Sequence, residues 1–176
     1  MNEIVKKNGI TYGVITGLVS ILITTLIYTI DLKLFISMWL GLSIIATYII
    51  IGCILLIKTK KDLKGIMSFK EGFTTYFISA VIGILVSVLF NILLFNYIDP
   101  AAKDTVKEYT IEYTVEMMEK FGTPASAINE AVKGMQEVDQ FSTFELLKGS
   151  IFSIAFSAVF GLILAAIFKT KRREEF

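Results

Sequence analysis

Histidine is absent from this chain of 176 residues, which has only one cysteine and two prolines. Without histidine, the chain lacks the side chain that most often acts as a general base or a metal ligand near neutral pH. The single cysteine, Cys53, excludes an intrachain disulfide, and its neighbours in the sequence are apolar, so we expect a packed thiol rather than a nucleophile. We therefore expect no enzyme activity, no cofactor and no metal site.

Charged residues are also missing from four long apolar runs, in a chain that is 55% hydrophobic with a mean hydropathy of +0.70. These runs are Gly9–Ile30, Leu34–Ile57, Phe73–Tyr97 and Gly149–Phe168. About 20 apolar residues in a helix cross a bilayer core, so we predict an all-α polytopic membrane protein with four transmembrane helices. The first run is too long for the apolar core of a signal peptide, and no small-residue cleavage site follows it. We expect it to be a retained helix.

The charges between these runs are divided unequally between the two sides of the predicted membrane. One side, which holds both termini and the second loop, carries 11 basic and 5 acidic residues; the other carries 6 basic and 11 acidic residues. Loops rich in Lys and Arg stay in the cytoplasm. We therefore expect cytoplasmic N- and C-termini, with residues 99–145 outside.

The segment 99–145 contains signals for two helices joined by a short turn. Asp99–Pro100 is typical of a helix start, and Gly122 of a helix end. A second helix is predicted from about Ala125 to Val138. Ser142 and Glu145 have the spacing of a capping box at the start of the fourth transmembrane helix. The segment is thus predicted to be an extracytoplasmic helical hairpin.

The first helix of this hairpin should carry an acidic ridge beside a wide apolar arc. The ridge consists of Glu108, Glu112, Glu116 and Glu119, which recur about once per turn. Carboxylates bind calcium, but the ridge lacks the loop of Asp, Asn and Gly that such sites use, so we expect a solvated face. Beside it, Tyr109, Tyr113 and Met117 form one apolar flank and are candidate partner contacts.

Small residues recur at four-residue intervals on three of the predicted transmembrane helices. They are Gly9, Gly13 and Gly17; Ser79, Gly83 and Ser87, followed by Asn91; and Gly149, Ser153, Ser157, Gly161 and Ala165. Small residues let helices approach closely in lipid, so these faces are predicted to form the bundle interior. Asn91 has two possible roles, a hydrogen bond between helices or the lining of a substrate path. The absence of ionisable residues from the four runs argues against ion-coupled transport.

The third run is preceded by the short sequence SFKEGF, residues 68–73. One interpretation is an interfacial helix start, with aromatic anchors and a glutamate at the positive end of the helix dipole. The other is a cytoplasmic contact site for a partner, formed by Phe69, Lys70 and Glu71.

SFKEGF, the four apolar runs and the sequence EMMEKFGTPASAINEAVKGMQ between the last two runs resemble domain-of-unknown-function family 4199 over nearly the whole chain. The resemblance implies a four-helix membrane protein of the bacterial inner membrane, largely found in Bacteroidota, with no established activity or catalytic residues. We expect a structural or accessory subunit that contacts lipid and uses its outer helices for a protein partner or self-association, without nucleic acid. The alternative is a small oligomeric transporter or channel.

Overall fold

A computed structural model of the protein describes residues 2–170, and this range is helical, with no strand. Six α-helices and two short helices of other types follow one another along the chain. They are α1 (Glu3–Ile30), η1 (Leu32–Ile36), α2 (Met38–Asp62), α3 (Phe69–Leu93), η2 (Leu94–Ile98), α4 (Pro100–Lys120), α5 (Ala125–Glu137) and α6 (Thr143–Phe168). The tail residues Lys171, Arg172, Arg173, Glu174 and Glu175, counted in the charge comparison, lie outside the described residues.

Four helices are long and apolar enough to cross a membrane: α1, α2, α6 and the continuous pair α3–η2. The predicted number and order of these helices are therefore confirmed. Three of them begin earlier than their apolar runs, α1 at Glu3, α3 at Phe69 and α6 at Thr143. The reason is that a helix continues through polar residues until a cap satisfies its free N–H groups, here from Asn2, Ser68 and Ser142.

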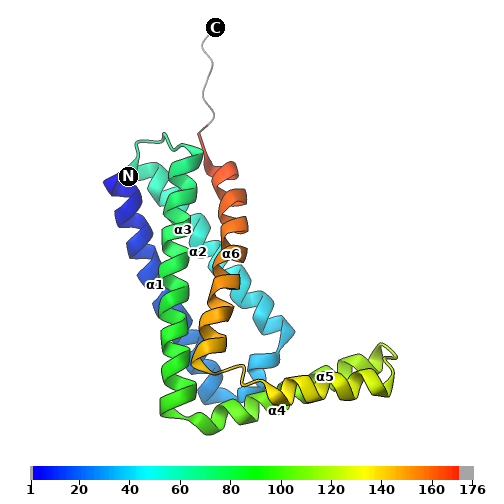
Figure 1. The fold of residues 1–176 in the computed structure, drawn as a ribbon. Coiled ribbons are helices and arrows are strands. Elements are labelled where there is room, and N and C mark those ends of the chain that lie inside the picture. The colour runs from blue at the N-terminus through cyan, green and yellow to red at the C-terminus, as the bar shows by residue number, and fades with distance from the viewer. Residues whose placement is uncertain (1, 171–176) are drawn as a thin grey trace.

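Helix α3 lies at the centre of the bundle, where it packs against α1 and α6 (Figure 1). The N-terminus, the α2–α3 connection and the end of α6 lie at one end of the bundle. The α1–α2 connection and the α4–α5 hairpin lie at the opposite end, and the hairpin extends sideways past the bundle. The N-terminal half of α2 is loosely packed, with Trp39 81% exposed.

At the end that holds the termini, polar bonds tie the helices together. Asn8 of α1 donates hydrogen bonds to Thr59 Oγ1 (3.2 Å) and Asp62 Oδ2 (2.9 Å) of α2. Thr170 Oγ1, just after α6, accepts from the Met67 backbone N–H and donates to the Gly65 carbonyl. These bonds fix α1 to α2 and join the end of α6 to the α2–α3 loop.

An aromatic cluster organises the opposite end. The fully buried Phe95, on the π-helical turn η2, lies 5.6 Å from the Phe35 ring and 4.4 Å from the Phe141 ring, measured between centroids. Helix α4 starts beside this cluster at the predicted position, where Asp99 accepts a bond from the Ala102 N–H. The cluster therefore anchors the hairpin to the transmembrane bundle.

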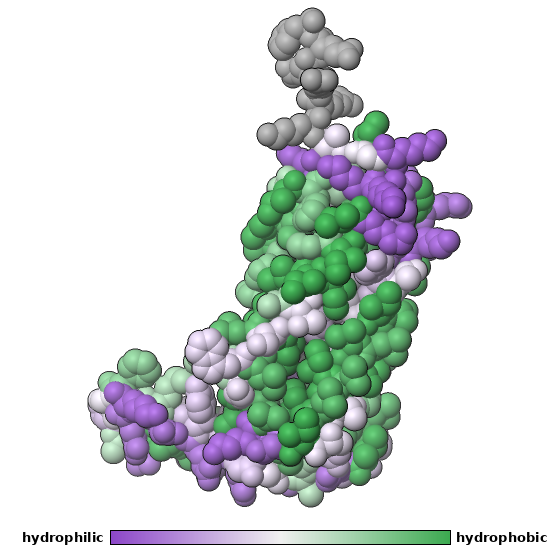
Figure 2. Space-filling view, turned by 180° about the vertical axis from the view of Figure 1, so that it is seen from behind, coloured by the Kyte–Doolittle hydropathy of each residue, from purple (hydrophilic) through white to green (hydrophobic). Residues whose placement is uncertain are grey.

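Figure 2 shows a broad hydrophobic band between two hydrophilic regions, one beside the termini and one on the hairpin. Such a band is what the hydrocarbon region of a bilayer requires of a protein surface.

Candidate functional site

The glycines of α1 form its contact with α3. A Cβ atom placed on Gly9, Gly13 or Gly17 would lie only 2.6 to 2.9 Å from the nearest side-chain atom of α3. On the α3 side, Gly83 is equally close to Thr16, and Ser87 Oγ accepts a hydrogen bond from Ser20 Oγ at 2.7 Å. Helices α1 and α3 therefore pack with their backbones in close contact, which leaves no room for larger side chains between them.

A second close contact centres on Tyr76 of α3, whose ring lies between a glycine of α2 and a glycine of α6. A Cβ on Gly52 would lie 2.6 Å from the Tyr76 ring, and one on Gly161 would lie 2.7 Å from it. Tyr76 also belongs to the buried cluster with Leu56 and Leu164. The three helices α2, α3 and α6 are thus locked together at this level of the bundle.

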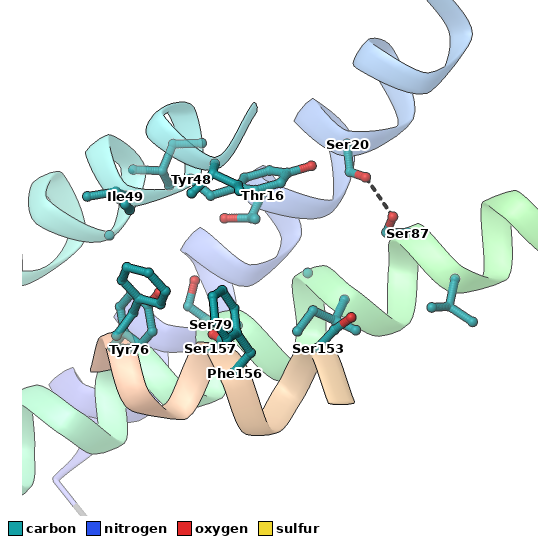
Figure 3. A pocket seen from close by; sticks show the side chains of 18 residues that line it. Thr16, Ser20, Tyr48, Ile49, Tyr76, Ser79, Ser87, Ser153, Phe156 and Ser157 are labelled. Atoms are coloured by element: carbon teal, nitrogen blue, oxygen red, sulfur yellow. Dashed lines mark hydrogen bonds between the residues drawn. The ribbon is translucent and has the colours of Figure 1, made fainter. Parts of the chain in front are cut away.

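Next to Tyr76, the helices border a cavity of about 410 Å³ (Figure 3). Side chains from α1, α2, α3 and α6 surround it, and 18 residues line it. Five candidates from the small-residue ridges lie on its wall: Ser79, Gly83, Ser87, Ser153 and Ser157. The ridges therefore meet around a space rather than along one continuous helix contact.

The small residues of α6 have two different environments. Gly161 and Ala165 are buried against the bundle. In contrast, a Cβ on Gly149 would meet nothing within 4 Å, and Ser153 is exposed, with its hydroxyl donating to the Gly149 carbonyl. The N-terminal half of the predicted α6 ridge thus borders the cavity and its surroundings instead of packing on a helix.

Asn91 lies away from the cavity wall and donates its amide hydrogen bond to the Ser87 carbonyl of its own helix. Asn96 of η2, in contrast, reaches a distant segment: it donates to the carbonyl of Phe141, in the connection between α5 and α6, at 2.9 Å.

Helix α4 has three faces. Ala102 and Val106 are buried against the bundle, and the candidate contacts Tyr109, Tyr113 and Met117 continue this line outward, half-buried. Helix α5 covers a second face, and Asp139, in the connection just after α5, pairs there with Lys103 at 2.7 Å. This hydrogen bond, opposed in part by burial, holds the pKa of the Asp139 carboxyl below its ordinary value.

The third face of α4 carries the four glutamates of the ridge, and all four are exposed. Glu116 pairs with Lys120, whose hydrogen bond lowers the pKa of the Glu116 carboxyl. In the described part of the chain, the side chains of Glu108, Glu112 and Glu119 form no ion pair. The hairpin therefore presents uncompensated negative charge to its surroundings.

The residues of SFKEGF form a capped helix start. Glu71 accepts hydrogen bonds from the backbone and side chain of Ser68, and Phe69 stacks on Phe73. Phe69 and Lys70 are exposed. At the capping box predicted for the start of α6, Ser142 caps the Glu145 N–H, but the Glu145 carboxylate binds Lys148, so the reciprocal bond of a full box is missing.

Sequence reasoning missed Gly52, Tyr76, Thr16 and Tyr48 as neighbours of the cavity. Gly52 stands outside any four-residue repeat, and a tyrosine in an apolar run carries no signal of its own. The one signal available in the sequence was the serine and threonine residues of the first, third and fourth apolar runs, some of which line the cavity.

The chain matches the family described as "Protein of unknown function (DUF4199)" over residues 11–170. No curated protein and no solved structure matches it. Because the match covers most of the chain, this four-span helical protein belongs to the DUF4199 family of unknown function.

Proposed function

We propose that this protein is an accessory or structural subunit of the bacterial inner membrane that binds a partner protein through its α4–α5 hairpin. We also propose an orientation in which both termini are cytoplasmic and the hairpin lies outside the cytoplasm. Among the described residues, the end with the termini carries eight basic and three acidic residues, and the hairpin end carries six basic and eleven acidic residues. This difference supports the orientation, because basic loops stay in the cytoplasm.

The observation that carries the proposal is the exposed glutamate face of α4, beside the half-buried Tyr109, Tyr113 and Met117. Aromatic residues and methionine are enriched in protein–protein interfaces. The unpaired carboxylates of Glu108 and Glu112 would repel the anionic headgroups of a membrane surface, which attracts Lys and Arg instead. A partner protein with a basic surface fits this face by charge complementarity.

The alternative, an oligomeric transporter or channel, has less support from the geometry. The glycine ridge of α1 is closed against α3, and Asn91 bonds to its own helix. The buried cluster of Leu56, Met67 and Leu164 lies against Tyr76 at the terminal end of the bundle, beyond the cavity. We also propose no enzymatic role, because the hairpin and the cavity offer no arrangement of a nucleophile with a base.

Site-specific crosslinking in native membranes tests the interaction. A photoreactive amino acid at position 113, in place of Tyr113, should capture a partner protein. The double variant Glu108→Lys and Glu112→Lys should lose this product, whereas Glu130→Lys on the exposed side of α5 should keep it. A product that survives the double charge reversal, or that is lost equally in Glu130→Lys, would contradict the proposal.

Cysteine labelling tests the orientation separately. In a Cys53→Ala background, a membrane-impermeant maleimide added to intact cells with a permeabilised outer membrane should label Glu112→Cys. Lys61→Cys, exposed at the opposite end, should react only after the inner membrane is opened. The reverse pattern would place the hairpin in the cytoplasm and overturn the proposed topology.

A further inference from the structure

The cavity between α1, α2, α3 and α6 is lined by neutral groups of two kinds (Figure 3). Eight of its 18 lining residues carry hydroxyls, the others are apolar or small, and none is charged. A buried ion without a partner is strongly disfavoured, so walls of this kind suit an uncharged molecule. The volume of about 410 Å³ falls within the range of small-molecule sites, which is roughly 300–1,000 Å³.

Several hydroxyls on the cavity wall form no hydrogen bond within residues 2–170, and the most buried of them belongs to Ser79. Ser79 is only 5% exposed, and its side chain forms no hydrogen bond within residues 2–170. Two other buried hydroxyls of the bundle have partners: Thr75 donates to the Glu71 carbonyl, and Ser20 donates to Ser87. A polar group at membrane depth has no water to bond, so it needs an internal partner or a ligand. Ser79 faces the cavity with its donor free.

The cavity opens sideways between α2 and α6. The wall residues on these two helices include Ile45, 44% exposed, and Phe156, 61% exposed. On α3, the wall residues Ser79 and Gly83 are buried. Because the mouth lies among apolar side chains of membrane-spanning helices, a molecule dissolved in the bilayer can reach it directly.

We propose that this cavity binds an uncharged lipid that enters from the bilayer between α2 and α6 and accepts a hydrogen bond from Ser79 Oγ through a carbonyl oxygen. The apolar walls hold the hydrocarbon part of the lipid, and the hydroxyl-rich floor holds its oxygen-bearing end. Diacylglycerols and isoprenoid quinones share this chemistry, since both are neutral and both present carbonyl groups.

Photolabelling of the full chain in phosphatidylcholine nanodiscs tests the proposal. Three diazirine-bearing probes are compared: a diacylglycerol, an isoprenoid quinone and the anionic phosphatidylglycerol. We expect saturable labelling of peptides within 45–52, 76–88 or 153–160 by one of the neutral probes, which identifies its source, and no saturable labelling by phosphatidylglycerol.

Two variants and one matched control locate the site. Ser79→Ala should weaken the apparent affinity about five- to tenfold, the usual effect of one lost hydrogen bond. Ile45→Trp, which fills the exposed mouth without touching the core, should abolish saturable labelling. Ser43→Ala, an exposed serine on α2 outside the cavity wall, should label like the wild type.

Three results overturn the proposal. The first is an absence of saturable labelling at these peptides by both neutral probes. The second is equal saturable labelling by phosphatidylglycerol, which would mean that the protein does not select against charge. The third is wild-type affinity in either Ser79→Ala or Ile45→Trp.

Discussion

Replacing Gly13 by alanine should destabilise the bundle, because the α1–α3 contact has no room for a methyl group. The added Cβ would lie 2.7 Å from Ile82 Cβ and 3.0 Å from the Ser79 carbonyl oxygen. Neither atom is the end of a flexible side chain, so the helices must move apart. Overpacking of this kind costs about 1–3 kcal/mol.

The matched control is Gly41→Ala on α2, where an added Cβ meets nothing within 4 Å. Both substitutions replace glycine by alanine within a helix and gain the same intrinsic helix propensity, about 1 kcal/mol. The difference between the two variants therefore isolates the steric term. We expect Gly13→Ala to be less stable than Gly41→Ala by about 1–3 kcal/mol.

The free energy of unfolding of both variants is measured by SDS titration in mixed micelles. Equal stabilities for Gly13→Ala and Gly41→Ala would refute the close α1–α3 contact. A large loss of stability in Gly41→Ala would instead mean that another part of the protein covers this side of α2.

Three further perturbations probe other parts of the fold. Phe95→Ala should cost about 3–5 kcal/mol and release the hairpin, seen as faster hydrogen exchange in α4, because Phe95 is fully buried in the aromatic cluster; unchanged exchange would contradict its anchoring role. Asn8→Ala should cost about 1.5–3 kcal/mol in the same SDS titration, since it removes a bond to a carboxylate and leaves the buried Thr59 hydroxyl without its donor; a neutral effect would argue against the α1–α2 tie. Asp139→Asn should loosen α5 at pH 7 by less than about 1 kcal/mol, because this ion pair with Lys103 is partly exposed. The pKa of Asp139 is lowered in the folded state, so its contribution is present above the ordinary aspartate pKa of about 3.9 and is lost as the pH falls through the lower folded value. If hydrogen exchange in α5 differed between the wild type and Asp139→Asn by the same amount at pH 7 and at pH 3, this assignment would be contradicted.

The elements of the fold were largely predictable because each depends on local signals. A membrane helix needs an uncharged run of about 20 residues, and this condition located all four helices. The limits of α4 follow from Asp99–Pro100 at its start and Gly122, with a φ of +70°, just after its end. Predicted boundaries differ most at Glu3 and Thr143, where capping rather than hydropathy decides the first residue.

The cavity was not predictable, because it depends on the separation of helices that are distant in the sequence. A four-residue repeat of small residues identifies a helix face but not what lies opposite it. Gly161 meets Tyr76, whereas Ser153 on the same face borders a space. The tight contact at Tyr76 needs one glycine from each of α2 and α6, and the single Gly52 forms no repeat.

The position of the cavity follows from the geometry of crossing helices. Ser153 precedes Gly161 by two turns, which is about 12 Å along the helix axis. If α2 and α6 cross near Tyr76 at one of the preferred angles, about 50°, with axes about 9 Å apart at the crossing, the axes are about 13–14 Å apart at that distance from it. Large side chains on both helices would fill such a gap. On α6, Phe156 and Phe160 occupy part of the wall, but Ser153 and Ser157 are small, so they leave space there and add hydroxyls to it. Small residues that close one end of the bundle therefore create a cavity farther along the same helix.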